Sequence, residues 1–329
     1  MPKTLKKHYQ SLFKAIYEQN LKSVTALLEM NINPDSKNEA GSALLHIAAA
    51  FPSSEILRAL IAYGADLSAT DINGNTALHI GAISGRSVNV AILVSEGADI
   101  NATGWAKNTP LLTAALSGHI DVVIELLTQG AKIKAQDIAG KTALHLAIEH
   151  GHSDIAQYLI SNTGISREAK DSFGCTPLHW AASQGDDNTA ALLLNCKVKI
   201  ETQDNAGKRA LHLASEMGSV NIARLLVEEY HANVRAIDAE RETPLHWAAY
   251  YGSYEIAELL SSNGASFDGL NIYGETPADC IRDLTNIPLV NALTRALPES
   301  EGYFSGTSGD HTQEHDAAYI LMMLGGDIL

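Results

Sequence analysis

A four-residue motif close to Thr-Pro-Leu-His recurs along this chain at nearly constant spacing. Its complete copies are Thr176–His179 and Thr243–His246. Looser copies end at residues 46, 79, 112, 145, 212 and 279, so the fourth positions of successive copies lie 33 or 34 residues apart. A period of this length is typical of stacked supersecondary units that bury their apolar faces only against one another. The motif therefore predicts one solenoid, although the length of 329 residues alone would suggest two compact domains.

Each part of the period has a structural explanation. Thr supplies a hydroxyl for a helix N-cap, and Pro fits the first helical turn, where its missing amide is not needed. Glycines six residues after the histidine position can adopt the positive φ that ends this helix. They are Gly85, Gly118, Gly151, Gly185, Gly218 and Gly252. A second helix is predicted to bury an aliphatic pair such as Leu126-Leu127, and an Asp-x-x-Gly turn such as Asp71 to Gly74 follows.

The combination of the Asp-x-x-Gly turn, the Thr-Pro-Leu-His motif, the helix-ending glycine and the paired aliphatics resembles the ankyrin repeat. The resemblance covers residues 10–297 as nine units, between an N-terminal extension at 1–9 and a C-terminal segment at 298–329. It implies an all-α repeat solenoid of helix-turn-helix units with projecting β-hairpin-like loops. The first and last units are expected to be caps, because Asp279 replaces the histidine of the last unit and Pro288 interrupts its second helix.

Composition excludes several classes of partner. The formal net charge of −15 argues against binding to nucleic acid or to anionic lipid, both of which require a concentrated basic face. No apolar segment has the length of a membrane span or follows the basic residues at the start as a signal peptide would. Three cysteines without C-x-x-C spacing indicate reduced thiols. We therefore expect a cytoplasmic protein, monomeric and without a cofactor.

Thirteen histidines raise the question of a metal site or a catalytic site. Six of them occupy one position of the repeat, where the resemblance to ankyrin repeats implies hydrogen bonds to the loops of adjacent units. His311 and His315 match the H-x-x-E-H pattern of inverted zinc proteases, and a zinc hydrolase is therefore an alternative. Only 14 residues follow His315, and their acidic residues are Asp316, directly beside the motif, and Asp327. Chance is the better explanation, and we expect no enzyme and no bound metal.

Function is therefore expected where the repeat varies. Large aromatic residues at surface positions are frequent anchors of protein interfaces. The predicted partner-binding residues lie at loop tips and at the ends of the first helices. They are Trp105, Phe173, Tyr250, Tyr251, Tyr273, Glu149, His150, Glu216 and Met217. Each aromatic residue could instead pack only on the adjoining repeat. Trp180 and Trp247 directly follow a repeat histidine, and we predict that both belong to the core.

The acidic residues among these variable positions favour a partner with a basic surface. They are Glu149, Glu216, Glu240, Glu242 and Glu275. The alternative is a solvated acidic surface that only keeps the protein soluble, and charge alone does not decide between the two.

The last segment departs from the repeat. Residues 298–311 are rich in Gly, Ser and acidic residues and resemble a linker, and the apolar run Ala317–Leu324 follows. That run either caps the last repeat or binds in the groove of a partner. The predicted function is a scaffold or adaptor that binds a partner protein through the concave face of the repeats. Ser300–Asp316 also resembles the tail of ankyrin-repeat effectors that intracellular bacteria secrete into host cells, and such an effector is the alternative.

Overall fold

A computed structural model describes residues 3–38, 41–282 and 286–294 of the chain. The chain divides into two compact units, Met1–Ser172 and Phe173–Leu329, here called the first and the second unit. In the described residues the structure is helical, with two isolated β-bridges and no β-strand. The predicted all-α repeat architecture is therefore confirmed, whereas the hairpin-like loops contain at most single bridges.

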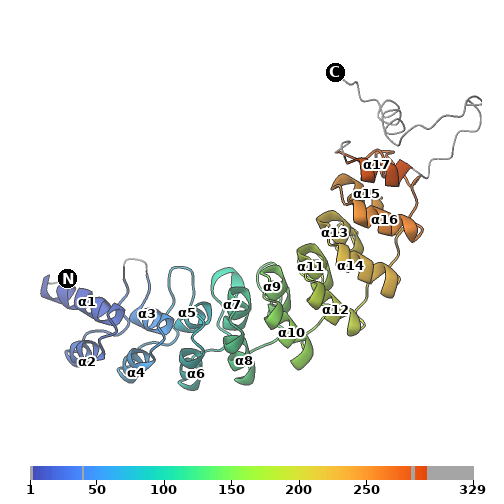
Figure 1. Ribbon diagram of the computed structural model, residues 1–329. Helices are drawn as coiled ribbons and strands as arrows, with labels where there is room; N and C mark the ends of the chain where they lie inside the picture. The colour runs from blue at the N-terminus through green and yellow to red at the C-terminus, as the bar shows by residue number, and fades with distance from the viewer. Residues whose placement is uncertain (1–2, 39–40, 283–285, 295–329) are drawn as a thin grey trace, which may run out of the picture. The chain divides into compact units, whose positions relative to one another are not determined.

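Five helix pairs form the first unit. They are α1 (Lys3–Tyr17) with α2 (Leu21–Glu29), α3 (Leu44–Ala50) with α4 (Glu55–Ala62), α5 (Ala77–Ile83) with α6 (Ser87–Ser95), α7 (Pro110–Ser117) with α8 (Ile120–Thr128), and α9 (Ala143–Glu149) with α10 (Ser153–Asn162). The first helices of the pairs lie in one row and the second helices in another, as Figure 1 shows. We call them inner and outer helices. A short 3-10 turn, η1 (Trp105–Lys107), lies in the loop before α7.

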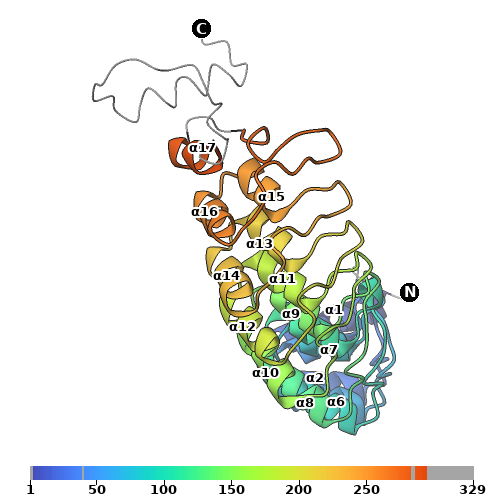
Figure 2. The same ribbon diagram turned by 90° about the vertical axis from the view of Figure 1, so that its right-hand side faces the viewer.

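The second unit repeats this arrangement. Its pairs are α11 (Pro177–Gln184) with α12 (Asp187–Asn195), α13 (Ala210–Met217) with α14 (Val220–Arg224) and its π-helical continuation η2 (Leu225–Glu229), and α15 (Pro244–Tyr250) with α16 (Tyr254–Ser262). A final helix, α17 (Ile287–Thr294), packs against α16. Figure 2 shows the connecting loops of this unit extending on the side of the inner helices, away from the outer ones.

Aliphatic side chains of both helices form the core between neighbouring pairs. Leu78, Leu93, Leu111 and Leu126 are completely or almost completely buried, and each contributes about 1.5–3 kcal/mol through removal from water. The paired aliphatics are not equivalent: Leu126 is buried but Leu127 remains half-exposed. Consecutive helical residues point about 100° apart, so only one member of such a pair faces the core squarely.

The repeat histidines connect each helix start to the next loop. In α11 the Thr176 amide donates to Nδ1 of His179 over 3.2 Å, and the threonine Oγ1 lies 2.8 Å from the same nitrogen. A neutral ring that accepts at Nδ1 carries its proton at Nε2. Nε2 of His179 accordingly donates to the Lys208 carbonyl of the following loop over 3.2 Å. This confirms the structural interpretation of the repeat histidines.

The same bond to the next loop recurs at four other histidines. The Nε2 contacts are His46 to the Asn75 carbonyl (2.9 Å), His79 to Asn108 (3.0 Å), His212 to Ala236 (3.2 Å) and His246 to Glu275 (3.3 Å). His119 and His152 use Nε2 to reach carbonyl groups of the preceding inner helix, those of Ile83 and Leu116. Histidine thus ties neighbouring repeats together at both ends of the inner helices.

The turn glycines behave as predicted. All six that end the inner helices have φ between 68° and 79°. At Gly118 a Cβ atom would also lie 2.5 Å from the His152 ring, so the close approach of that histidine requires glycine. The glycine and the histidine contact therefore depend on each other.

Both ends of the array differ in detail from the sequence prediction. Helix α1 begins at Lys3, so the described residues of the expected N-terminal extension continue directly into the first helix. In the last repeat, Asp279 Oδ2 accepts from the Thr276 amide (2.8 Å) and hydroxyl (2.6 Å), as the histidine ring does elsewhere. The predicted interruption at Pro288 is wrong, because Pro288 lies in the first turn of α17, where proline is tolerated.

The C-terminal predictions concern residues outside the described part of the chain. They include the linker at 298–311, the H-x-x-E-H match at His311 and His315, the effector-like tail at 300–316 and the apolar run at 317–324. These stay predictions from sequence. No described helix combines the length and apolar character needed to cross a membrane.

The buried histidines should make stability depend on pH. Burial lowers the pKa of His212 to about 4, with opposing smaller effects of Asp238 and Arg209, and it also lowers the pKa of His46, His79 and His246. The unfolded chain binds these protons first, so stability is complete above pH 6.5 and falls as the pH drops toward 4. For His212 alone the loss between pH 7.5 and pH 5 is about 2 kcal/mol.

Urea unfolding at the two pH values measures this loss. His212→Gln should reduce the pH dependence, whereas the control His150→Gln, at an exposed histidine, should leave it unchanged. Equal stability of the wild type at pH 7.5 and pH 5 would contradict the account.

A loop turn offers a test of backbone strain. Gly74, Gly140, Gly174, Gly207 and Gly274 occupy the left-handed turn position with φ between 72° and 80°, and Arg241 occupies it with φ of 61°. Arg241→Gly should raise the free energy of unfolding by about 0.5–1 kcal/mol, because a left-handed residue with a Cβ is strained. The control Gly207→Ala should lower it, since the new Cβ would also lie 2.8 Å from the Ala239 nitrogen. Loss of stability in Arg241→Gly would refute this prediction.

Candidate protein-binding surface

The loop tips expose three of the predicted anchors. Trp105 is 63% exposed, Phe173 61% and Tyr273 66%. Trp105 belongs to the first unit, and the other two belong to the second. These aromatic residues are therefore accessible to a partner, and their binding role stays a prediction.

Successive tips are joined by backbone hydrogen bonds. In the first unit the Ile138 amide donates to the Ala106 carbonyl and the Ser172 amide to Ala139, both over 2.8 Å. In the second unit the corresponding bonds run from Asn205 to Phe173, from Ala239 to Ala206 and from Ile272 to Glu240 over 2.9–3.0 Å. Side chains at the tips are thus presented on a regular, internally bonded backbone.

The first unit carries a row of apolar tips, which we call the tip row: Ile72, Trp105 and Ile138. All three are exposed. The turn at Trp105 lacks the usual Asp, and the Asn75 Oδ1 atom accepts from the Trp105 amide instead, over 3.1 Å. Ala106 and Lys107 then adopt left-handed conformations with φ of 53° and 61°. Two strained residues beside an exposed tryptophan are typical of a functional loop.

The second unit carries an aromatic cluster at the end of α15, which we call the aromatic shelf: Trp247, Tyr250 and Tyr251. Trp247 stacks on Tyr251 with ring centroids 6.1 Å apart and an interplanar angle of 16°, and Tyr250 lies 6.2 Å from Trp247. Tyr251 is 56% exposed and Tyr250 is half-buried. The shelf brings two predicted anchors together.

The prediction that Trp180 and Trp247 belong to the core is wrong. Both are half-buried. The position after the histidine is filled by smaller residues elsewhere, for example Leu146, which is buried. Ile80 and Leu213 at the same position are half-buried like the two tryptophans. The Trp247 Nε1 donates to Oδ2 of the buried Asp238 over 3.0 Å. Burial at this position therefore differs from repeat to repeat, which a periodic pattern does not predict.

Two of the predicted acidic residues are neutralised by lysines. Glu149 accepts from Lys141 over 2.6 Å, and Glu216 accepts from Lys208 over 2.7 Å. The Lys208 ammonium also lies 3.5 Å from the centroid of the Trp247 ring. These glutamates therefore offer less charge to a basic partner than their positions in the sequence suggest.

Glu242, predicted among the variable surface positions, is instead buried. Its Oε1 accepts from Asn271 Nδ2 over 2.8 Å, and its Oε2 has no hydrogen-bond partner in the described residues. Burial raises the pKa of this carboxyl, and Asp238, Glu240 and Glu275 raise it further. Glu240 is exposed and Glu275 half-buried. No periodic signal distinguishes Glu242, because its burial depends on the neighbouring repeat.

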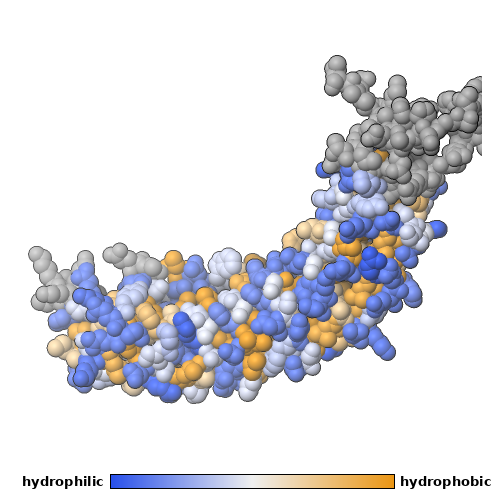
Figure 3. Space-filling view, viewed as in Figure 1, coloured by the Kyte–Doolittle hydropathy of each residue, from blue (hydrophilic) through white to orange (hydrophobic). Residues whose placement is uncertain are grey.

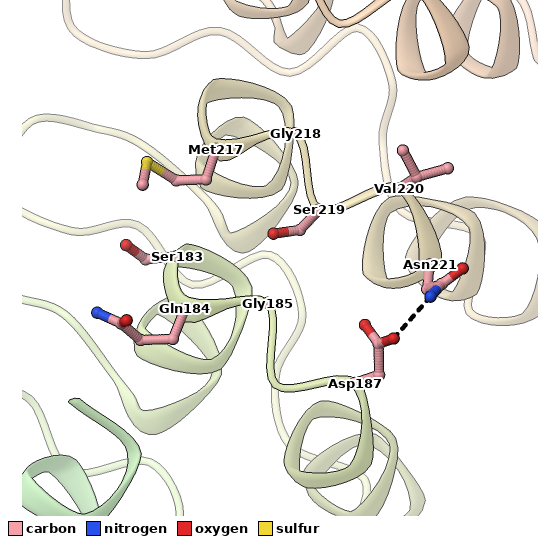
Figure 4. A pocket seen from close by; sticks show the side chains of 9 residues that line it. All are labelled: Ser183, Gln184, Gly185, Asp187, Met217, Gly218, Ser219, Val220 and Asn221. Atoms are coloured by element: carbon pink, nitrogen blue, oxygen red, sulfur yellow. Dashed lines mark hydrogen bonds between the residues drawn. The ribbon is translucent and has the colours of Figure 1, made fainter. Parts of the chain in front are cut away.

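Met217 is the last residue of inner helix α13, His150 directly follows inner helix α9, and both are exposed. Met217 helps to line a shallow groove of about 540 Å³ in the second unit, shown in Figure 4. The groove residues are Ser183, Gln184, Gly185, Asp187, Met217, Gly218, Ser219, Val220 and Asn221. Across it, Asn221 Nδ2 donates to Asp187 Oδ2 over 2.7 Å. Apart from Met217 and Val220 the lining is polar or glycine, so it provides hydrogen bonds more than apolar contact.

Comparison with known proteins decides the family. The family model for ankyrin repeats matches residues 12–104, 103–171 and 178–271. The chain belongs to the ankyrin-repeat family. It is similar to palmitoyltransferase ZDHHC17 of Danio rerio (35% identity over 80 residues, 24% of this chain and 11% of that protein) and of Homo sapiens (33% over 78 residues, 24% and 11%). It is also similar to ankyrin repeat protein OPG189 of vaccinia virus strain Copenhagen (38% over 50 residues, 15% and 9%).

The chain thus matches 9–11% of the length of these relatives, and the likeness concerns a few repeats. In the described part of this ankyrin-repeat protein, no group of three or more His, Cys, Asp and Glu residues could hold a metal ion. Burial raises the pKa of the Cys280 thiol to about 12, so the thiol stays protonated and unreactive at neutral pH. The tip row, the groove and the aromatic shelf are the surface features that a partner could contact, and their binding role stays a prediction.

The buried carboxyl at Glu242 yields a stability prediction. Glu242→Gln should raise the free energy of unfolding by about 1 kcal/mol at pH 7.5, because the amide removes a buried charge and keeps the acceptor for Asn271. The folded-state pKa of Glu242 is raised, so the penalty of its charge is complete above that pKa and fades as the pH falls. The gain should therefore be smaller at pH 5.

The control is Glu240→Gln, at an exposed glutamate two residues earlier. It should change stability little at either pH. A destabilised Glu242→Gln protein at pH 7.5 would show that the carboxylate is better accommodated than its contacts indicate.

Proposed function

We propose that this ankyrin-repeat protein is a non-catalytic scaffold that binds a partner protein through its loop tips and inner-helix ends. The exposure of large apolar side chains at successive tips carries this proposal. An aromatic side chain buries about 150–250 Å² when it is covered, equivalent to roughly 4–6 kcal/mol of transfer free energy before the costs of association. A partner that covers two or three tips would gain enough for specific binding.

The backbone supports the same role. The hydrogen bonds between tips limit the loop motion that binding would otherwise have to suppress, and this lowers its entropic cost. The tip row and the aromatic shelf also carry the variable side chains, whereas the histidines and glycines build the array. On the face shown in Figure 3, hydrophobic residues are interspersed with hydrophilic ones, which suits a surface that is soluble alone and still binds.

A reducing compartment suits this chain, and we place its function in the cytoplasm. Cys175, Cys196 and Cys280 form no disulfide, and Cys196 is exposed. An exposed thiol without a disulfide is typical of proteins of reducing compartments.

Partner capture tests the proposal. Proteins retained from a cell lysate by the wild type are compared, by mass spectrometry, with those retained by a variant carrying Trp105→Ala, Phe173→Ala, Tyr251→Ala and Tyr273→Ala. The variant should fold, because all four side chains are largely exposed, and it should lose most of the specific partners. Retention of the same partners at equal yield would contradict the proposal.

The chain offers a matched control on the opposite side of the pairs. Met30, Tyr63 and Val88 are exposed apolar residues on or directly after outer helices. Their combined replacement by alanine removes exposed apolar area from a surface without a proposed role. This control variant should retain the partners of the wild type.

A further inference from the structure

We infer that the aromatic shelf binds a positively charged side chain, arginine foremost, from a segment of the partner protein. This inference rests on the proposed scaffold function and specifies the partner chemistry for the second unit.

Two rings of the shelf already hold cations of the chain itself. The Lys208 ammonium lies 3.5 Å from the centroid of the Trp247 ring, and the Arg282 guanidinium lies 4.7 Å from that of Tyr250. Cations are attracted to the negative faces of aromatic rings, and tryptophan and tyrosine are the better acceptors. These contacts within the chain show that the rings accept cationic side chains.

Tyr251 is the ring that remains for a partner. One of its faces stacks on Trp247, and more than half of the residue is exposed, so the opposite face is open to solvent. A planar guanidinium can stack on such a face while its N–H groups reach neighbouring acceptors. Met217 occupies the position equivalent to Tyr251 in the preceding repeat and is exposed as well. It can provide apolar contact for a residue next to the cation.

Carboxylates contact the two rings of the aromatic shelf that hold internal cations. Asp238 accepts from the Trp247 indole, and Glu275 lies 3.5 Å from the Tyr250 hydroxyl. Donation to an anion makes the Trp247 and Tyr250 rings more electron-rich, which favours the Lys208 and Arg282 cations already on their faces. Burial raises the pKa of Tyr250 to about 12, so the hydroxyl stays protonated and keeps its donor role.

The charge of the chain is also uneven. Residues 173–294 contain 16 Asp and Glu against eight Lys and Arg, whereas residues 1–172 contain 16 against 14. A basic segment is therefore attracted to the second unit more than to the first. The same field repels phosphate groups, which argues against a nucleotide or nucleic acid on this shelf.

Fluorescence polarisation with defined peptides tests the inference. The probe is a fluorescein-labelled 12-residue Gly-Ser peptide with two arginines and one leucine, and its counterpart has glutamates in place of the arginines. The arginine probe should bind and the glutamate probe should not. Tyr251→Ala should weaken the arginine probe about two- to fivefold, as expected for one exposed cation–π contact. Glu258→Gln, at an exposed acid of outer helix α16, is the control for general attraction and should weaken it less.

For a second pair of variants we expect tighter binding of the arginine probe. Lys208→Met removes the internal cation from Trp247 and leaves Glu216 unpaired, so the arginine probe should bind about two- to fivefold more tightly. Arg224→Met removes one positive charge from another ion pair of the same unit, that with Glu228 on the outer side. If charge alone acts, the two gains will be equal. The inference requires the larger gain for Lys208→Met.

Several results would overturn the inference. Equal effects of Tyr251→Ala and Glu258→Gln would reduce the binding to general attraction. Tighter binding of an uncharged leucine probe than of the arginine probe would assign the shelf to apolar ligands, and the scaffold function would stand. If Tyr251→Ala does not fold, Tyr251→Leu replaces it, because leucine retains apolar contact without a ring face and should show the same loss.

Discussion

The rest of this molecule depends on the two hydrogen bonds that each of four buried histidines makes, namely His79, His179, His212 and His246. In His246, as in His79, Nδ1 accepts at the start of its own helix while Nε2 contacts a carbonyl of the next loop. One side chain thereby fixes where an inner helix begins and how the neighbouring loop is placed against it. Both partners are buried or partly buried, so breaking either bond leaves an unpaired polar group at considerable cost. These bonds therefore set the positions of the loop tips and of the candidate binding residues on them.

A periodic sequence predicts what all copies share, and that part of the fold could be derived in advance. The histidine bonds, the positive φ of Gly118 and its equivalents, and the buried leucines follow from the repeat. The candidate site departs from the repeat, and its details depend on neighbours that differ from copy to copy. Trp247 is only half-buried and donates to Asp238, and Glu242 is buried beside Asn271 of the next repeat. Pro288 begins a helix instead of breaking one, since its effect depends on the turn in which it lies.

The net charge of the chain likewise does not predict how charge is distributed on its surface. The formal charge of −15 suggests a uniformly acidic surface. Glu149 and Glu216 are nevertheless paired with lysines, and Glu242 is removed from solvent. In the second unit, Asp238 accepts from the Trp247 indole and Glu275 lies 3.5 Å from the Tyr250 hydroxyl, so two carboxylates contact the aromatic shelf. The first unit, nearly balanced in charge, exposes isoleucine and tryptophan at its tips, so two different kinds of contact are available on one scaffold.

The state of the histidine rings tests the basis of this account most directly. Long-range ¹H–¹⁵N NMR spectra of uniformly labelled protein distinguish the two neutral tautomers of each ring from the charged form. At pH 7 the account predicts neutral rings with the proton on Nε2 for His46, His79, His179, His212 and His246, and this state should persist in His212 at pH 5.5 because its pKa is lowered to about 4. Charged rings, or protons on Nδ1, at pH 7 would contradict it, since Nδ1 of His79, His179, His212 and His246 could then no longer accept from the backbone amide at the start of its own helix.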